Sequence, residues 1–328
     1  MATSKAYTDA QNALEAAIQA GSVTQLEAAI ENACLPENAV SPVHNILCDT
    51  LRNCVRHGKA ELVSYILEKH ELEYDITSRV SSLDVWRHFS IPTIRMLLAR
   101  GWDINQPDLD AGSSAPRLID LAVGNEDRLR WIVEHGGARV EDRPDPQIHG
   151  ATRLLEICAI NGTVSTFKFL QSKGAQIAPN TLHCAVQAAA KEGLDPDART
   201  DSAADPGDDA KAKSNQERIE MLRFLVDNLG LDVNAYDAKI AVYQEEFGTP
   251  LHYAASRECG EAVVKWLLNR GAKPTIKNKQ GVDVEDHAKA RNFEKIVGII
   301  QGWKIGTDWR TRARSRRPED IIEVIGGW

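Results

Sequence analysis

The chain has 328 residues, of which 26% are charged and 43% hydrophobic, and its formal net charge is −8. This composition is that of a soluble globular chain, and the negative charge argues against general nucleic-acid binding, because phosphates need a positive surface. No stretch approaches the ~18 apolar residues of a membrane span, and residues 1–7 lack the apolar run of a signal peptide. We therefore expect a cytoplasmic protein that does not bind membranes.

Motifs that hold metals or cofactors are missing from the sequence. The six cysteines include no Cys-x-x-Cys pair, so a zinc knuckle or a redox motif is not supported. The nine histidines show no H-E-x-x-H spacing, and neither a P-loop nor G-x-G-x-x-G is present. We expect no metal and no cofactor, and interpret the cysteines as small buried residues in a reducing compartment.

Pairs of amphipathic helices recur along the chain, beginning near residues 9, 44, 79, 114, 150 and 180. In the second helix of each pair, apolar residues are spaced three and four apart, which places them on one face. A glycine follows, and Gly101, Gly137 and Gly174 lie 36 and 37 residues apart. Glycine suits this position because it adopts the left-handed conformation that ends a helix.

Two insertions interrupt the pattern. Residues 193–214 contain six aspartates, two prolines and no large apolar residue after Leu194, so we predict a disordered acidic insertion there. Residues 238–248 lengthen the connection between the sixth and seventh pairs. That segment is partly apolar and β-prone, and we predict an extended finger.

The seventh pair carries the clearest motif. Residues 248–255 read Gly-Thr-Pro-Leu-His-Tyr-Ala-Ala, and a second apolar helix follows and ends at Gly271. This segment resembles the ankyrin repeat, whose signature is T-P-L-H-x-A. The resemblance implies an all-α ankyrin-repeat solenoid of about eight helix-pair units with short β-hairpin tips, spanning residues 1–303. In the eighth unit, near residue 280, Asp283 replaces the motif threonine and Glu285 replaces its core leucine, as expected of a terminal unit with one solvated face.

Residues 304–328 form a basic C-terminal tail. Its arginines alternate along the sequence, which suits an extended segment, and Pro318 followed by acids predicts a short helix over 318–325. The tail could fold back on the acidic solenoid, act as a nuclear-import signal that makes the protein nuclear, or contact nucleic acid. These arginines are Arg310, Arg312, Arg314, Arg316 and Arg317.

The resemblance implies a protein-binding scaffold or adaptor, whose partner is another protein held in the concave groove and by the inserted loops. Groove candidates lie at first-helix ends and tips, where tryptophan beside arginine and histidine is typical of a binding hot spot. The alternative for Trp86 is packing between neighbouring repeats. The candidates are Arg56, His57, Trp86, Arg87, His88, Asn125, Glu126, Ser256 and Arg257, with Tyr243 and Phe247 from the finger.

The sequence also allows a second function, that of an enzyme. Histidine and carboxylate side chains facing each other in the groove could transfer protons, which would make the groove a small-molecule pocket of an enzyme. The sequence names no catalytic residue and favours binding over catalysis. His183 and His252 stand at the motif histidine, for which the resemblance implies a structural hydrogen-bonding role.

Overall fold

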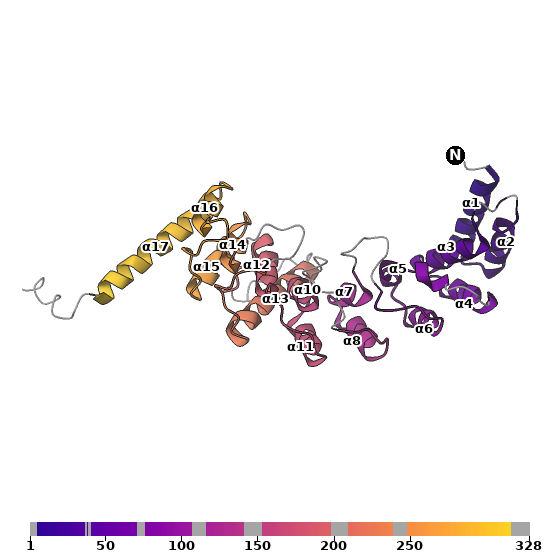
Figure 1. The fold of residues 1–328 in the computed structure, drawn as a ribbon, viewed down its shortest axis with the longest axis horizontal. Coiled ribbons are helices and arrows are strands. Elements are labelled where there is room, and N and C mark those ends of the chain that lie inside the picture. Colours follow the sequence, from indigo (N-terminus) through magenta and orange to yellow (C-terminus); the bar gives the residue numbers. More distant parts are fainter. Residues whose placement is uncertain are drawn as a thin grey trace, which may run out of the picture. The chain divides into compact units, whose positions relative to one another are not determined.

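The computed structural model describes residues 5–36, 38, 41–70, 76–106, 116–140, 153–197, 209–238 and 248–315. It divides into two compact units, Met1–Pro144 and Asp145–Trp328 (Figure 1). All regular structure in these ranges is helical, as predicted, and no strand occurs in them, so they do not show the expected β-hairpin tips as strands. Across the same ranges, no helix is both long and apolar enough to span a membrane.

Unit 1 consists of helix pairs joined by short turns (Figure 1). The first helices of the pairs pack against one another, α1 on α3, α3 on α5 and α5 on α7, while the second helices α2, α4 and α6 form a neighbouring row. The elements are α1 (Lys5–Ala20), α2 (Val23–Ala33), α3 (Val43–Arg56), α4 (Ala60–Lys69), a 3-10 turn (Ile76–Arg79), α5 (Ser82–Arg87), α6 (Ile91–Ala99), α7 (Leu118–Ala122) and α8 (Glu126–Glu134).

Unit 2 repeats this arrangement. Its first helices α10, α12, α14 and α16 pack in sequence, and each lies against the second helix of its own pair. A π-helical turn, Phe224–Asn228, extends α13. The elements are α10 (Leu154–Asn161), α11 (Val164–Ser172), α12 (Thr181–Lys191), α13 (Asp209–Arg223), α14 (Pro250–Ala255), α15 (Glu261–Asn269), α16 (Val284–Lys289) and α17 (Glu294–Ser315).

The turns that follow second helices connect neighbouring pairs in both units. Gly101 and Gly271 have φ of 90°, a conformation that a side chain would strain. Beyond Gly101, the Asn105 side chain accepts from Arg139 N at 2.7 Å and donates to Gly137 O at 3.3 Å. Asn234 makes the same two contacts in unit 2, to Lys273 N at 2.8 Å and Gly271 O at 3.1 Å. In each of these two turns, one asparagine therefore links one pair to the next.

The C-terminal helix differs from the expectation of an extended basic segment, because α17 continues as a helix to Ser315. It is attached to α16 through Glu285, which accepts hydrogen bonds from Lys304 at 2.6 Å and Gln301 at 2.9 Å. Lys289 also pairs with Glu285, and these contacts lower the pKa of Glu285 to about 2, the bond from Lys289 contributing most. The unusual Glu285 thus fixes the last helix.

The predicted insertions are only partly described. In the acidic insertion, α13 already begins at Asp209, so residues 209–214 are helical, whereas 198–208 lie outside the described residues. The finger residues 239–247 and the short helix predicted over 318–325 also lie outside them. Two residues that flank the stretch 239–247 are hydrogen-bonded to each other, because Asp237 N donates to Gly248 O at 2.9 Å.

Three histidines of unit 2 are buried, and burial lowers the pKa of each. His252 accepts from Thr249 N at 3.2 Å through Nδ1, and its Nε2 lies 3.3 Å from Val282 O. This geometry fits a neutral imidazole that caps α14 and reaches the next pair. His287 lies beside His252 and Arg291, and its pKa falls to about 4, mainly through burial.

A substitution at Leu267 tests whether the helix pairs of unit 2 are stabilised by a shared apolar core. Its side chain is fully buried in α15, so we expect Leu267→Ala to lower the free energy of unfolding by about 3 kcal/mol, through lost burial and the cavity left behind. Urea denaturation followed by circular dichroism measures this change. The control is Lys265→Ala on the exposed face of the same helix, where we expect a change within about 0.5 kcal/mol. Equal effects would contradict the assignment of the buried face.

The buried histidines predict that unit 2 is destabilised by mild acid. The folded state disfavours protonated His287, whereas the same histidine in the unfolded chain binds a proton near pH 6.5. The contribution of neutral His287 to the free energy of unfolding is therefore complete above pH 6.5 and is lost as the pH falls. Between pH 7.5 and 5.0 we expect His287 alone to remove about 2 kcal/mol. His287→Gln should flatten the profile measured by denaturation at each pH, while His135→Gln, at an exposed position, should leave it unchanged. A profile equally steep in His287→Gln excludes this origin.

Candidate functional site

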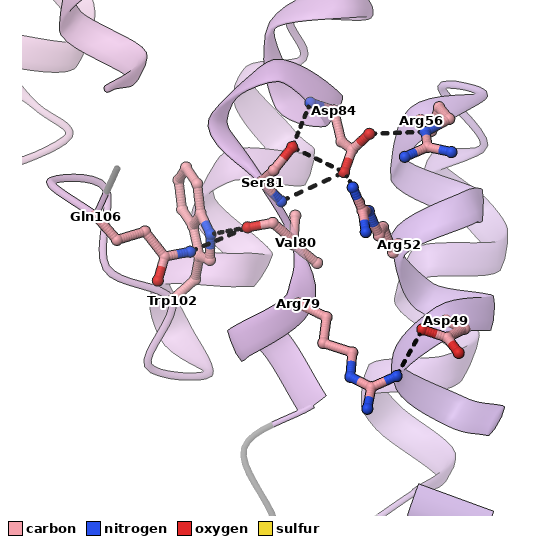
Figure 2. Close-up of polar contacts among 9 residues, drawn as sticks. All are labelled: Asp49, Arg52, Arg56, Arg79, Val80, Ser81, Asp84, Trp102 and Gln106. Carbon is pink, nitrogen blue, oxygen red and sulfur yellow. Dashed lines mark hydrogen bonds and ion pairs between the residues drawn. The ribbon is translucent and has the colours of Figure 1, made fainter. Parts of the chain in front are cut away.

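A buried carboxylate organises the candidate site in unit 1. Asp84 lies in the first turn of α5, and its side chain closes a capping box with Ser81, whose hydroxyl accepts from Asp84 N at 3.2 Å. The residue is only 2% exposed. Two arginines of the preceding first helix reach it, with Nε of Arg52 at 2.8 Å and Nε of Arg56 at 2.7 Å (Figure 2).

The charge of Asp84 is stabilised by these neighbours. Burial alone would raise its pKa, since desolvation disfavours a carboxylate. Hydrogen bonds from Arg56, Arg52 and Ser81 outweigh burial and hold the pKa of Asp84 below its ordinary value. The carboxylate is therefore ionised at neutral pH, and it holds the guanidinium groups of Arg52 and Arg56 through their Nε atoms.

Figure 2 also shows how the backbone before α5 is held. Val80 O accepts from Trp102 Nε1 at 2.9 Å and from Gln106 Nε2 at 3.0 Å, both from the following turn. Arg79 pairs with Asp49 on α3 at 2.9 Å. The segment that positions Asp84 is thus held from both sides, by α3 and by the turn that follows α6.

Arg56 and His57 also line a pocket between α1 and α3. Its volume is about 260 Å³. Its apolar wall is Leu14, Ile18 and Ile46, all buried. Its remaining residues are polar or aromatic: Tyr7, Gln11, Glu15, Ser41, Asp49, Thr50, Asn53, Arg56 and His57.

The structure brings together three of the groove candidates. His57 ends α3, and Gly58 follows with φ of 67°. The imidazole of His88, from the end of α5, lies against Gly58 so closely that a Cβ there would stand 2.9 Å from His88 Cγ. Arg56, His57 and His88 therefore lie at neighbouring first-helix ends. Within the described residues, neither histidine hydrogen-bonds a carboxylate; the partner of His57 is Gln19 at 3.5 Å.

Trp86 packs between helices and remains half-exposed. Its ring meets Phe89 edge-on at 5.9 Å, and the guanidinium of Arg128, on α8, lies 4.9 Å from the Trp86 centroid and 5.0 Å from that of Phe89. The cation is thus stacked on aromatic faces. Trp86 contacts the neighbouring pair while its neighbour Arg87 is exposed.

Asn125 and Glu126 serve their own helix. The Asn125 side chain caps α8 by accepting from Arg128 N at 3.1 Å, and Glu126 pairs with Arg130 at 2.7 Å. Both contacts are local to α8.

The other candidates belong to unit 2 and the tail. The Ser256 hydroxyl donates to Tyr253 O at 2.7 Å, and Arg257 Nε is buried without a hydrogen-bond partner in the described parts of the chain. Tyr243 and Phe247 lie outside the described residues, as do Arg316 and Arg317. Arg310, Arg312 and Arg314 belong to the helical backbone of α17, and their side chains are not described.

Sequence reasoning missed Asp84 and Arg52. Asp84 stands three residues after Ser81, the spacing of a capping box, and that spacing was the available signal. Asp120 and Glu156 occupy the corresponding place in α7 and α10, and both are buried. The position that holds histidine in α12 and α14 therefore holds an acid in these earlier helices. In the described segments no group of three or more histidine, cysteine or acidic side chains could hold a metal ion.

Asp84→Asn tests the importance of the ion pairs. The variant keeps the shape of the side chain but leaves Arg52 and Arg56 without their counter-charge, so we expect unfolding of unit 1 to require about 2 kcal/mol less. The control is Asp127→Asn, an exposed acid on α8, for which the loss should stay below about 0.5 kcal/mol. Chemical denaturation of each variant measures the difference. Equal losses in both variants would show that the pairs contribute nothing specific.

Comparison with known proteins identifies one of these helix pairs. No curated protein matches the chain. The family model of the ankyrin repeat matches residues 248–279, which contain α14, α15 and the turn after Gly271. Residues 248–279 of the chain therefore form a segment that matches the ankyrin repeat.

Proposed function

We propose that the chain is a protein-binding scaffold, in which the helix pairs of both units are further copies of the ankyrin repeat. The family supports protein–protein interaction in general terms. The extension to other pairs is supported by the matching contacts of Asn105 and Asn234, one in each unit. It is also supported by the row of first helices within each unit.

The contact surface that we propose lies at the first-helix ends of unit 1, and we call it the α3–α5 face: Arg56, His57, Trp86, Arg87 and His88. One observation carries this assignment. The packing of His88 on Gly58 unites the two helix ends into one surface. Arg87 and His88 are exposed there, while Trp86 is anchored by Arg128. A fixed aromatic ring next to exposed cations is the composition of a binding hot spot.

The α3–α5 face is basic, although the chain is acidic overall. Arg52 and Arg56 together carry two positive charges, against the single negative charge of Asp84. Arg87 adds a third positive charge. We therefore propose an acidic surface on the partner protein, because complementary charge speeds association and disfavours wrong partners. Among the described residues, no contact of His57 or His88 favours the enzymatic alternative, and we do not propose it.

A charge reversal within this face tests the proposal. We expect Arg87→Glu to weaken capture of the physiological partner at least fivefold, which corresponds to about 1 kcal/mol. The measurement is quantitative mass spectrometry of proteins retained by the immobilised full-length chain, followed by titration of the retained protein.

The matched control is Arg100→Glu, which makes the same charge change at an exposed position after α6. We expect Arg100→Glu to retain the partner as the natural chain does. Identical retention by both variants, or loss from both, would show that the α3–α5 face is not the contact surface.

A further inference from the structure

The pocket between α1 and α3 contains polar groups that the chain itself does not use. Arg56 donates from Nε to Asp84, and its two terminal nitrogens have no partner within the described structure. The side-chain amides of Gln11 and Asn53, which also line the pocket, likewise make no hydrogen bond there. Unengaged polar groups converging on one concave site are characteristic of a ligand-binding pocket.

The orientation of Arg56 determines which group it can bind. Its Nε is held at 2.7 Å from Asp84, so the guanidinium is fixed before a ligand arrives (Figure 2). The two terminal nitrogens that remain carry parallel N–H groups, whose spacing matches the two oxygens of a carboxylate. Arg56 therefore favours an anionic, planar group.

The other walls select what is attached to that carboxylate. Gln11 and Asn53 each offer an acceptor and two donors, as needed for a peptide N–H and C=O. Glu15, on α1 at the pocket, is exposed and repels a second anion while accepting from an N–H group. The buried Leu14, Ile18 and Ile46 favour an apolar side chain.

The volume limits the size of the ligand. At about 260 Å³ the pocket is smaller than the ~300 Å³ at which pockets for drug-sized molecules begin. An acidic side chain within a peptide would have to bring chain on both of its sides to the pocket. A terminal residue instead presents its carboxylate, its own N–H and its side chain within one small volume.

We propose that this pocket binds the C-terminal residue of a partner protein, with the terminal carboxylate on Arg56 and an apolar side chain against Leu14, Ile18 and Ile46. This inference rests on the proposed scaffold function and names the part of the partner that is recognised. The pocket adjoins the α3–α5 face through Arg56 and His57, so a partner's end could bind while its body contacts that face.

The test uses three fluorescein-labelled peptides and the full-length chain. The first is Gly-Ser-Gly-Ala-Leu with a free carboxylate, the second is the same peptide as its C-terminal amide, and the third is amidated Gly-Ser-Gly-Glu-Leu. Fluorescence anisotropy measures each dissociation constant. We expect the free acid to bind at least tenfold more tightly than either amidated peptide, because each amide lacks the terminal charge-assisted bonds.

Variants locate the binding. Arg56→Gln should weaken binding of the free acid at least tenfold, and Arg100→Gln, at an exposed arginine away from the pocket, should not change it. Because Arg56→Gln also removes a partner of Asp84, its folding is checked by thermal melting. Asn53→Leu leaves the Arg56–Asp84 pair in place, and we expect it to weaken binding at least threefold, as loss of one hydrogen bond does.

Several results would overturn the inference. These are equal binding of the acid and its amide, equal binding of the amidated glutamate peptide, undiminished binding by Asn53→Leu and Arg56→Gln, or no binding of the free acid at millimolar concentration. Failure here with partner capture still sensitive to Arg87→Glu would remove the pocket assignment alone. Loss of that sensitivity as well would remove the scaffold proposal.

Discussion

Short first helices are the physical constraint on which the rest of this structure depends. The helices α5, α14 and α16 have six residues each and α7 has five, far fewer than an isolated helix needs to persist in water. Such helices form only if their free N–H groups are capped and their apolar residues packed against neighbours. Each of these short first helices therefore depends on the side chain in its first turn and on the adjacent pair.

This constraint explains why buried polar groups occur where they do. The first-turn side chain must accept a backbone hydrogen bond within the stacked row, so it is buried whether it is histidine or acid. His252 meets the need as a neutral imidazole. Asp84 meets it with a full charge, and a buried charge requires partners. Arg52 and Arg56 supply them from the preceding first helix, so that the cap of one pair is neutralised by the pair before it.

The same requirement generates the candidate binding surface. Arg56 is oriented by a structural contact to Asp84, and the same residue lines the pocket. The stability of unit 1 and its proposed recognition chemistry thus share one ion-pair cluster. A substitution at Asp84 is expected to affect both stability and recognition. Substitutions at Asn53 or Arg87 are expected to affect recognition and to leave stability unchanged.

The sequence by itself determined the helical class, the repeat at residues 248–279 and the glycines that end second helices, because those features depend on local spacing and on conformations that only glycine adopts without strain. It also indicated Arg56, His57 and His88 as helix-end residues. Only the tertiary structure decided that these side chains meet, that Trp86 lies under Arg128, and that Asp84 is the buried centre of the site. Such contacts join residues 28 to 42 positions apart, and local propensity carries no information about which cation reaches which carboxylate. For the same reason, α17 extends through a basic segment that alternation alone assigned to an extended chain: Glu285 anchors the preceding turns of that helix from α16.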